Sequence, residues 1–400
     1  MRPANIFLLM IAITTTGASS ASAQFLRPKC IPVAPLVCPP VSPIPGEPGM
    51  VTPPTTPLIP PMDPNAPNPP LPGQNDPLQN AFAQGSEGGG NASRSFNESF
   101  NGDFGGIFVT RQVQVGTRSV TLSSGTAPGS TVLRPVFRDV VVPLASRYNG
   151  ILITDNDSPR PVDRVYFGYN YYNNIGTSLN DGFDRIDMHR QTLGFEKTFL
   201  DGNASFGMRL PFIQTTGPSS VAQSNVGDLS LLLKYAFYNN LNTGDVASTG
   251  LVLTTPTGGG NDVILSDGNT PANSVIFQPW LGGVRMLPRG YAQGITSFLV
   301  PTDGRDPLLF NNSLALAYFL YQNANDRFVN ALIPFVEAHV RTPLNNSDPD
   351  SAIFFQNQTN LTFGTHFRTV RSTLSPAFSV PLVGPKPYSG EFNLMLNVRF

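Results

Sequence analysis

The last ten residues of the 400-residue chain alternate between apolar and mostly polar side chains. Phe392, Leu394, Leu396, Val398 and Phe400 occupy every second position of this segment. Successive side chains of a β-strand point to opposite faces, so the segment predicts a strand with one apolar and one polar face. Such a strand fits either a soluble antiparallel sheet or the wall of a barrel that crosses a membrane.

The same pattern recurs from residue 160 onward. In the segment 227–239, leucines at 229, 231 and 233 share one face, and polar residues at 228, 230 and 234 share the other. Most of the segments reach the ~9–11 residues that a tilted strand needs to cross a bilayer. We expect twelve strands, at 160–172, 185–199, 203–213, 227–239, 245–255, 275–287, 291–300, 310–322, 328–340, 354–367, 372–381 and 390–400.

The connections between these strands alternate in length. A tight turn containing Asp201-Gly202 is followed by the longer link 214–226, then the short link 240–244, then the long link 256–274. Barrels of outer membranes have short periplasmic turns and longer outer loops. The alternation therefore predicts an all-β fold, a transmembrane antiparallel β-barrel of about twelve strands in residues 160–400, with both of its ends on the periplasmic side.

The start of the chain predicts export. Residues 1–23 combine an early arginine, a short apolar run and the small residues Ala21-Ser22-Ala23, which are the parts of a cleaved signal peptide. No later stretch approaches the ~18 consecutive apolar residues of a transmembrane helix. The net charge of −1 gives no basic face for nucleic acid. We expect a protein of the bacterial outer membrane.

Two segments precede the predicted barrel. Residues 24–75 are rich in proline and predict a disordered periplasmic linker, which acts either as a tether to the cell-wall layer or as a solvated tail. Cys30 and Cys38 lie in it and form either a local disulfide or a two-cysteine metal site. Residues 76–159 are rich in Gly, Asn and Ser, with weak strands at 107–115, 119–123 and 136–144 that form a plug or a periplasmic hairpin.

Two resemblances support an outer-membrane barrel. The final strand resembles the closing strand of bacterial outer-membrane barrels, in which a carboxy-terminal aromatic residue such as Phe400 is the signal for the barrel-assembly machinery. The segments Gly227–Tyr235 and Leu251–Gly258 resemble a strand of the type G-D-L-x-L-x-L-K-Y and a P-T-G-like turn. Both are found in the outer-membrane barrels of the MetA-pathway-of-phenol-degradation family. This resemblance implies uptake of aromatic or other hydrophobic solutes and supplies no catalytic residues.

The chain offers no motif for catalysis, a cofactor or a metal. None of the three histidines, His189, His339 and His366, belongs to an H-x-x-x-H or H-E-x-x-H pattern. Some barrels are hydrolases that use a Ser–His pair, and His339 with Glu337, or His366 with Ser372, could be assigned to such a role, although no strand shows the signature of that family. We expect a protein that is not an enzyme.

The predicted barrel strands also carry charged residues on their polar faces. A charge on the lipid face is costly, up to ~2–4 kcal/mol for Arg or Lys at mid-depth, so we expect these residues to line the lumen. They either zip the barrel shut or form a constriction that selects solutes. The expected function is passage of small solutes, with a plugged anchoring barrel as the alternative. The expected lumen-lining residues are Glu196, Arg209, Lys234, Arg285, Glu337, His339, Arg368 and Arg399.

Overall fold

The structure is a computed structural model that describes most of the chain from residue 98 onward. The predicted signal peptide, the Pro-rich linker and the pair Cys30 and Cys38 lie outside the described residues and stay predictions. The described ranges are 98–102, 108–122, 130–143, 152–180, 184–218, 221–259, 265–270, 274–323, 328–348, 350–383 and 386–400.

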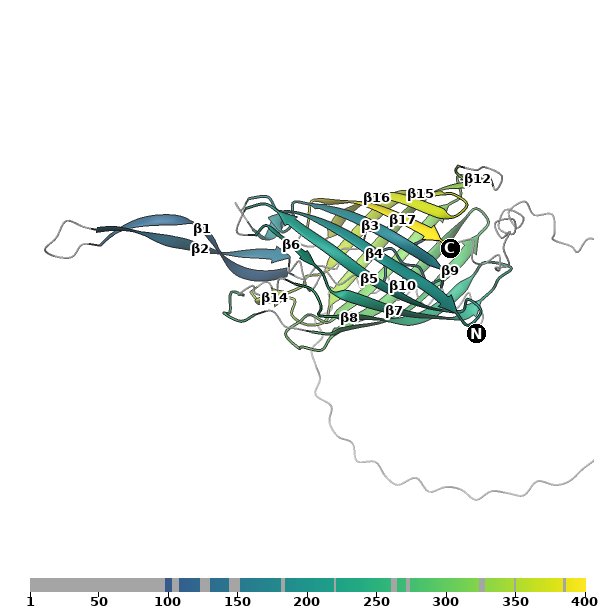
Figure 1. Cartoon of the computed structure of the whole chain (residues 1–400), viewed down its shortest axis with the longest axis horizontal. Helices are drawn as coiled ribbons and strands as arrows, with labels where there is room; N and C mark the ends of the chain where they lie inside the picture. Colours follow the sequence, from purple (N-terminus) through teal and green to yellow (C-terminus); the bar gives the residue numbers. More distant parts are fainter. Residues whose placement is uncertain are drawn as a thin grey trace, which may run out of the picture. The chain divides into compact units, whose positions relative to one another are not determined.

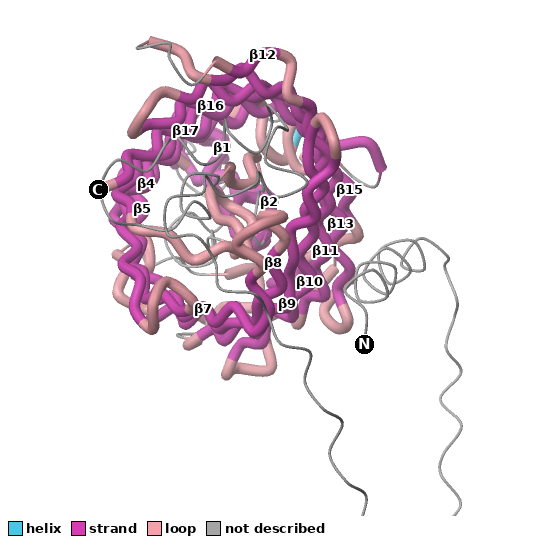
Figure 2. The backbone as a smooth tube through the Cα atoms, turned by 90° about the vertical axis from the view of Figure 1, so that its right-hand side faces the viewer, coloured by secondary structure: helices cyan, strands magenta, loops and turns pink. Residues whose placement is uncertain are grey.

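Twelve long strands in the described ranges close into an antiparallel barrel (Figures 1 and 2). Each pairs with the next along the chain, and the last pairs with the first, Arg399 opposite Arg164. The expected twelve-stranded barrel is confirmed. The strands are β3 (Arg164–Asn173), β4 (Asp187–Phe199), β5 (Ala204–Thr216), β7 (Leu229–Asn239), β8 (Val246–Thr255), β9 (Ile276–Leu287), β10 (Gly290–Pro301), β11 (Leu309–Tyr318), β13 (Ala331–Pro343), β15 (Gln358–Arg368), β16 (Ser372–Val383) and β17 (Gly390–Arg399).

Three shorter elements accompany this wall. β6 (Gln223–Val226) pairs with β5, and β12 (Tyr321–Gln322) pairs with β13. The 3-10 turn η2 (Thr177–Leu179) follows β3. Among the described residues, no helix is long and apolar enough to cross a membrane.

Polar and apolar side chains occupy opposite surfaces of the barrel wall. On β7, Leu233 is 49% exposed on the outside, whereas Lys234 next to it is 3% exposed inside. A water-soluble barrel has the reverse arrangement, with an apolar core and a polar exterior. An apolar outer surface around a polar lumen is typical of a barrel in lipid. Exposed apolar residues of the outer surface include Val165, Phe167, Leu193, Phe206, Phe212, Phe237, Phe277, Phe298, Leu316, Val336, Phe363, Leu374, Phe378, Phe392 and Leu396.

The two ends of the barrel differ in their connections. At one end, here called the turn end, the wall strands are joined by short links such as 200–203, where Asp201 and Gly202 have φ angles of 53° and 83°. At the other, here called the loop end, the links are longer, as between β8 and β9. The expected alternation of loop lengths is present for most of the wall, with the link 319–330 between β11 and β13 as an exception, because it is at the turn end and is as long as the loop-end link 217–228.

Two segments that precede β3 lie inside the barrel, where Figure 2 shows loop backbone enclosed by the ring of strands. We call residues 98–102 and 152–163 the lumen segments. All described side chains from 98 to 102 and from 152 to 162 are buried. Glu98 forms an ion pair with Arg368 near the turn end (3.5 Å), and Arg160 donates a hydrogen bond to the carbonyl of Gly244, also at that end. Each segment thus runs along the lumen.

The chain between the two lumen segments forms a hairpin at the loop end. β1 (Phe108–Leu122) pairs with β2 (Ser130–Pro143) and, through Phe108, with Phe354 of the short strand β14 (Ile353–Phe354). Figure 1 shows the hairpin extending beyond the barrel strands. Two of the expected weak strands, 107–115 and 119–123, are one strand with an irregularity between Gln114 and Gly116.

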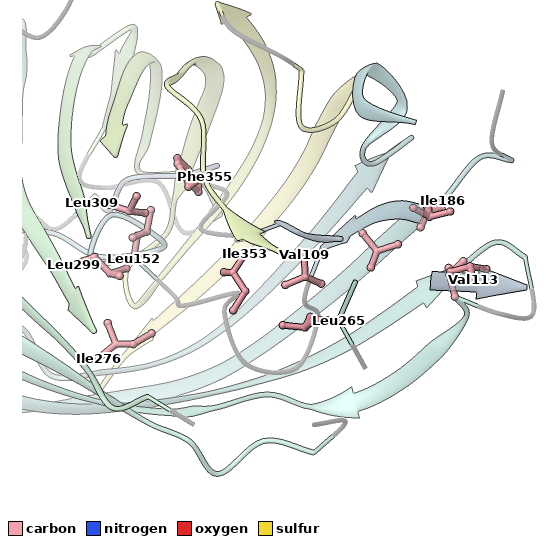
Figure 3. Packing of buried hydrophobic residues seen from close by; sticks show 13 residues of the cluster. Val109, Val113, Leu152, Ile186, Leu265, Ile276, Leu299, Leu309, Ile353 and Phe355 are labelled. Atoms are coloured by element: carbon pink, nitrogen blue, oxygen red, sulfur yellow. The ribbon is translucent and has the colours of Figure 1, made fainter. Parts of the chain in front are cut away.

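The base of the hairpin is packed into an apolar cluster at the loop end (Figure 3). The hairpin contributes Val109, the link between β8 and β9 contributes Leu265, and the link between β13 and β15 contributes Ile353. The wall contributes Leu299 and Leu309. Burying each such side chain contributes about 1.5–3 kcal/mol relative to leaving it exposed. The cluster therefore fixes the hairpin to the loop end of the barrel.

Candidate functional site in the barrel lumen

The carboxylate of Asp157 is the centre of the largest charged cluster in the described part of the lumen. Arg164 of β3 donates to its Oδ1 from a distance of 2.9 Å, and Lys234 of β7 donates to the same oxygen. Arg209 of β5 donates to its Oδ2. All four side chains are at most 1% exposed. Three wall strands therefore present cations to one carboxylate of a lumen segment.

A wall carboxylate, Glu196 of β4, neutralises part of this charge. Glu196 accepts from the Arg164 Nε at 3.1 Å and lies 2.8 Å from the Lys234 ammonium group. The Ser205 hydroxyl donates to it at 2.7 Å. Without Asp157, the wall would hold three cations against a single carboxylate in this cluster, which is a net positive site.

The charge of Asp157 follows from these contacts. Lys234, Arg209 and Arg164 all lie against its carboxylate, and nearby cations favour the ionised form of a carboxyl group. The ionised aspartate therefore attaches the lumen segment to three strands of the wall.

Hydrogen bonds to neighbouring groups hold the Arg209 side chain in position. Its Nε donates to the Tyr166 hydroxyl at 2.9 Å, and its Nη1 donates to the carbonyl of Leu152 at 3.0 Å. The Tyr166 ring lies across Gly194, where an added Cβ would come within 2.3 Å of the ring. Glycine at 194 therefore lets Tyr166 lie flat on the wall beneath the guanidinium group.

A second ion pair joins the same lumen segment to the wall. Asp155 lies 2.8 Å from the Arg190 guanidinium group, and both side chains are at most 2% exposed. Arg190 also lies over the ring of Tyr172, 5.6 Å from its centroid, a cation–π contact. Arg190 is on β4 nearer the loop end than Glu196, so charged contacts extend along the length of the segment.

The first lumen segment contacts a different part of the wall. The backbone N–H of Asn101 donates to Glu337 at 2.8 Å, and Glu337 lies 3.3 Å from His339. The other ring nitrogen of His339 is 2.9 Å from the Ser313 hydroxyl. The order Ser–His–Glu resembles a nucleophile, its base and an orienting acid. However, Ser313 is 2% exposed and the Phe100 ring lies against His339, so no substrate reaches this hydroxyl in the structure.

The other histidine named for a hydrolase has a different partner from the expected one. His366 contacts the hydroxyl of Ser375 at 2.7 Å rather than Ser372, and its second ring nitrogen is 3.2 Å from the Tyr291 hydroxyl. Ser375 is on the neighbouring strand β16, whereas Ser372 is at the turn and forms a hydrogen bond with Thr369. Among the described residues, no group of His, Cys, Asp and Glu side chains could hold a metal ion.

Seven of the eight expected lumen-lining residues share the inward-facing positions of their strands. Arg368 and Arg399 are half-buried at the turn end, where Arg399 donates to the carbonyl of Val370 at 3.4 Å. The remaining five are buried inside the barrel and at most 3% exposed: Glu196, Arg209, Lys234, Glu337 and His339.

Arg285 is not in the lumen, and the expectation for this residue is wrong. On β9 the buried positions are Gln278, Trp280 and Val284, so residue 285 faces outward. Its side chain is 46% exposed and forms an ion pair with Asp245 at the turn end. A charge on the outer surface is costly only within the hydrocarbon, and a guanidinium group near a strand end reaches the polar interface.

The sequence-based prediction missed several lumen residues. Arg164 and Arg190 follow the same alternation as residues that were identified, since Arg190 shares its face with Glu196. The pattern could therefore have found both. Asp155 and Asp157 lie in a segment with neither period-two nor period-3.6 alternation, and nothing in the sequence indicates that they are buried.

Comparison with known proteins gives structural likenesses alone. No family model matches the chain, and no curated protein matches it. It is similar to the COG4313 outer membrane channel from Pseudomonas putida F1, with 17% identity, a TM-score of 0.44, and coverage of 60% of this chain and 95% of that one. It is also similar to KdgM porin, with 9% identity, a TM-score of 0.35, and coverage of 59% and 99%.

A third solved structure to which it is similar is the TodX monoaromatic hydrocarbon channel, in its deltaS2 mutant form. The identity is 11%, the TM-score is 0.34, and the match covers 63% of this chain and 94% of that one. The description of this protein as a barrel rests on its own strand pairing and on its pattern of burial.

Proposed function

We propose that this chain is a barrel of the bacterial outer membrane that passes small solutes, hydrophobic or aromatic compounds included, and that its lumen segments gate the passage. The apolar outer surface supports a lipid environment. The strongly polar lumen supports a path for solutes. In the structure this path is closed by the lumen segments.

The observation that carries the proposal is where the partners of the wall charges come from. Arg190, Arg209 and Arg368 pair with Asp155, Asp157 and Glu98, which all belong to the lumen segments. In a barrel that is zipped shut permanently, the wall charges would pair with one another across the lumen. Here Glu196 pairs with two wall cations, Arg164 and Lys234. The other acidic partners are on a separate part of the chain, whose movement would leave the strand ladder of the wall intact.

Several finer features belong to the same proposal. The loop end faces the cell exterior, as the longer links of outer-membrane barrels do. Phe400 at the end of β17 is 64% exposed and serves as the signal for the barrel-assembly machinery. The Pro-rich linker is either a tether to the cell-wall layer or a solvated tail. Membership of the MetA-pathway-of-phenol-degradation family is proposed on the two segments that resemble it, 227–235 and 251–258.

A plugged anchoring barrel is the second candidate. The specific observation in its favour is the depth of burial of the attached segment, since Asp157 and its three cationic partners are at most 1% exposed. Breaking such a pair by removing one partner costs about 3–5 kcal/mol. If neither a solute nor water forms contacts with the separated charges that offset this cost, the lumen stays closed.

Conductance separates the two candidates. The mature chain and the double variant Asp155→Asn/Asp157→Asn are reconstituted in planar bilayers and in liposomes for swelling with neutral sugars of graded size. The double substitution keeps side-chain volume and removes the two acidic partners, so we expect it to raise conductance and swelling well above those of the unmodified chain.

The matched control is Asp303→Asn. Asp303 is an aspartate at the loop end that pairs with Arg305 at 2.8 Å, away from the lumen segments. It should leave conductance unchanged. Heat-modifiable electrophoresis reports whether each barrel is folded. A folded double variant that passes neither ions nor sugars would contradict the channel and favour the anchoring barrel.

A further inference from the structure

We propose that Arg164, Arg209 and Lys234 form a binding site for the carboxylate of small organic acids with an apolar body, and that Asp157 occupies this site while the lumen is closed. The inference rests on the proposed function, because a solute reaches the site only when the lumen segments move. It goes further by naming the chemical class of the solute.

The geometry is that of a carboxylate receptor. Both oxygens of the Asp157 carboxylate are used, Oδ1 by Arg164 and Lys234 and Oδ2 by Arg209. The donors come from β3, β5 and β7 of the wall, whereas the carboxylate comes from a lumen segment. Charge-assisted hydrogen bonds of this kind are among the strong ones in proteins. A fourth donor, the backbone N–H of Ser158 at 2.7 Å from Oδ1, belongs to the lumen segment itself. All three side-chain donors are therefore in the wall, and the aspartate is a replaceable ligand for them.

The charge of the wall requires an anion at this place. When Asp157 leaves, three cations remain with Glu196 as their wall carboxylate. Unpaired charges in a low-dielectric interior are costly unless a counter-charge or water replaces the partner. A carboxylate solute restores the three contacts that Asp157 made with the wall, whereas a neutral solute of equal size does not. Entry of such a solute and departure of the lumen segment are thus competing events.

An apolar patch lies beside the cations. Leu232 and Lys234 share the inward face of β7, so they are roughly 7 Å apart along the strand. Leu232 belongs to a buried cluster with Trp280 and Ile295 of the wall, and the lumen segments contribute Phe100 and Ile153 to the same cluster. Movement of the segments would uncover a wall surface with an aromatic and aliphatic part next to a cationic part. An aromatic acid fits both.

The test is rescue of Asp157→Ala by an added carboxylate. Removal of the side chain leaves a carboxylate-sized space between the three cations. The variant in lipid vesicles is heated with benzoate, benzamide, acetate or acetamide, and its unfolding midpoint is recorded. We expect benzoate to bind at least about tenfold more tightly than the nearly isosteric benzamide, and acetate to stabilise more than acetamide. Asp303→Ala is the control and should show no preference.

Two further variants test the assignment of residues. Adding Arg209→Gln to Asp157→Ala should abolish the preference for benzoate over benzamide. Adding Leu232→Ala should weaken the binding of benzoate and leave the binding of acetate unchanged, because only benzoate has a ring that contacts the apolar patch. If Asp157→Ala does not fold, Asp157→Asn is used with a second measurement, the reduction of its channel current by benzoate but not by benzamide.

The outcomes separate this inference from the proposed function. Equal effects of benzoate and benzamide would overturn the carboxylate site, even if sugars swell the liposomes and the channel stands. A preference for benzoate that persists in the Arg209→Gln background would overturn it as well. A clear preference in a barrel that conducts nothing would support the site and contradict the channel.

Discussion

The barrel wall and the lumen segments are buried to the same degree on their facing sides, yet they are encoded differently. In the wall, burial follows a period of two, so that Leu233 is outside and Lys234 inside. In the lumen segments nearly every residue is buried, and burial does not alternate along the chain. Leu152, for example, is 0% exposed and Ser158 is 2% exposed. Alternation specifies which face of a strand meets lipid, whereas the segments are held by individual polar contacts.

This difference has an energetic basis. Each apolar side chain that faces lipid stabilises a wall strand, and the loss of one such contact changes the free energy of unfolding little. A lumen segment places charged groups in buried positions, so each charge must find its partner or destabilise the closed state. We therefore expect substitutions in the lumen to act through single contacts, and substitutions on the outer surface to act through depth in the bilayer.

The largest effect is expected for Asn397→Arg. The alternation of β17 places residue 397 inside, and in a water-filled barrel an added arginine there would cost little. In the structure Asn397 accepts a hydrogen bond from Arg164 at 2.8 Å and donates one to Asn156 at 2.9 Å. A second guanidinium group there lies against Arg164, and the nearby carboxylates Asp157 and Glu196 already pair with Arg164, Arg209 and Lys234. We expect a loss of about 3–5 kcal/mol.

Urea unfolding in lipid vesicles measures the free energy of unfolding of this variant. Asn242→Arg, in an exposed turn, is the control and should be neutral. A cost near zero for Asn397→Arg would mean that the lumen segments do not fill this part of the barrel.

Two leucines sharpen the contrast between lipid and water. Leu233 is 49% exposed on the outer surface of the wall, and Leu133 is 67% exposed on the hairpin beyond the barrel. Leu233→Arg should lower the free energy of unfolding by ~2–4 kcal/mol, because the charge lies in hydrocarbon. Leu133→Arg should have no measurable effect in water. Both are compared by urea unfolding in vesicles, and equal effects would rule out a lipid belt at β7.

Two glycines test how tightly the first lumen segment fits. Gly102 has a φ of 66°, and an added Cβ would lie 2.1 Å from the Ser379 hydroxyl oxygen. Gly102→Ala combines backbone strain with overpacking, which costs about 1–3 kcal/mol. We expect the segment to become sensitive to added protease while the barrel stays folded by heat-modifiable electrophoresis. Gly116→Ala in the hairpin meets nothing within 4 Å and should change neither measurement.

The smallest effect is expected for Arg285→Ala. The Arg285 side chain is 46% exposed, and its partner Asp245, which is 5% exposed, keeps a hydrogen bond from the Met286 N–H when the arginine is removed. Exposed pairs contribute ~0–1 kcal/mol. An impermeant thiol reagent gives a second measurement, since Arg285→Cys should react in detergent-solubilised barrels and Arg209→Cys should not. Protection of a cysteine at 285 would restore the original expectation that this residue faces the lumen.

The sequence predicted the wall because the wall obeys a rule that is local. The expected strand 227–239 corresponds to β7, which begins two residues later, at Leu229, and ends at the same residue, Asn239. The first strand begins at Arg164 rather than 160, because Pro161 lacks the N–H that a ladder needs and residues 152–163 serve as a lumen segment instead. The expected strand 354–367 also divides, with Phe354 pairing to the hairpin and β15 beginning at Gln358.

The contents of the lumen could not be predicted in the same way. Which carboxylate meets Arg209 depends on a chain segment 52 positions away in sequence, and no periodicity records that contact. Alternation places Glu196 and Arg209 on the inward face but gives no information about what stands opposite. The error at Arg285 has the same origin, since the cost of an outward charge depends on its depth in the membrane and not on its position in the strand alone.

The passage of one chain twice through the ring has a consequence for how the protein is made. The seam of the ring lies between β3 and β17, so the barrel is complete only when the final residues pair with Arg164 and its neighbours. By then the hairpin must already be on the far side, because a finished and filled ring leaves no opening through which a two-stranded element could be drawn. We therefore infer that the hairpin reaches the loop end before β3 and β17 pair and close the ring.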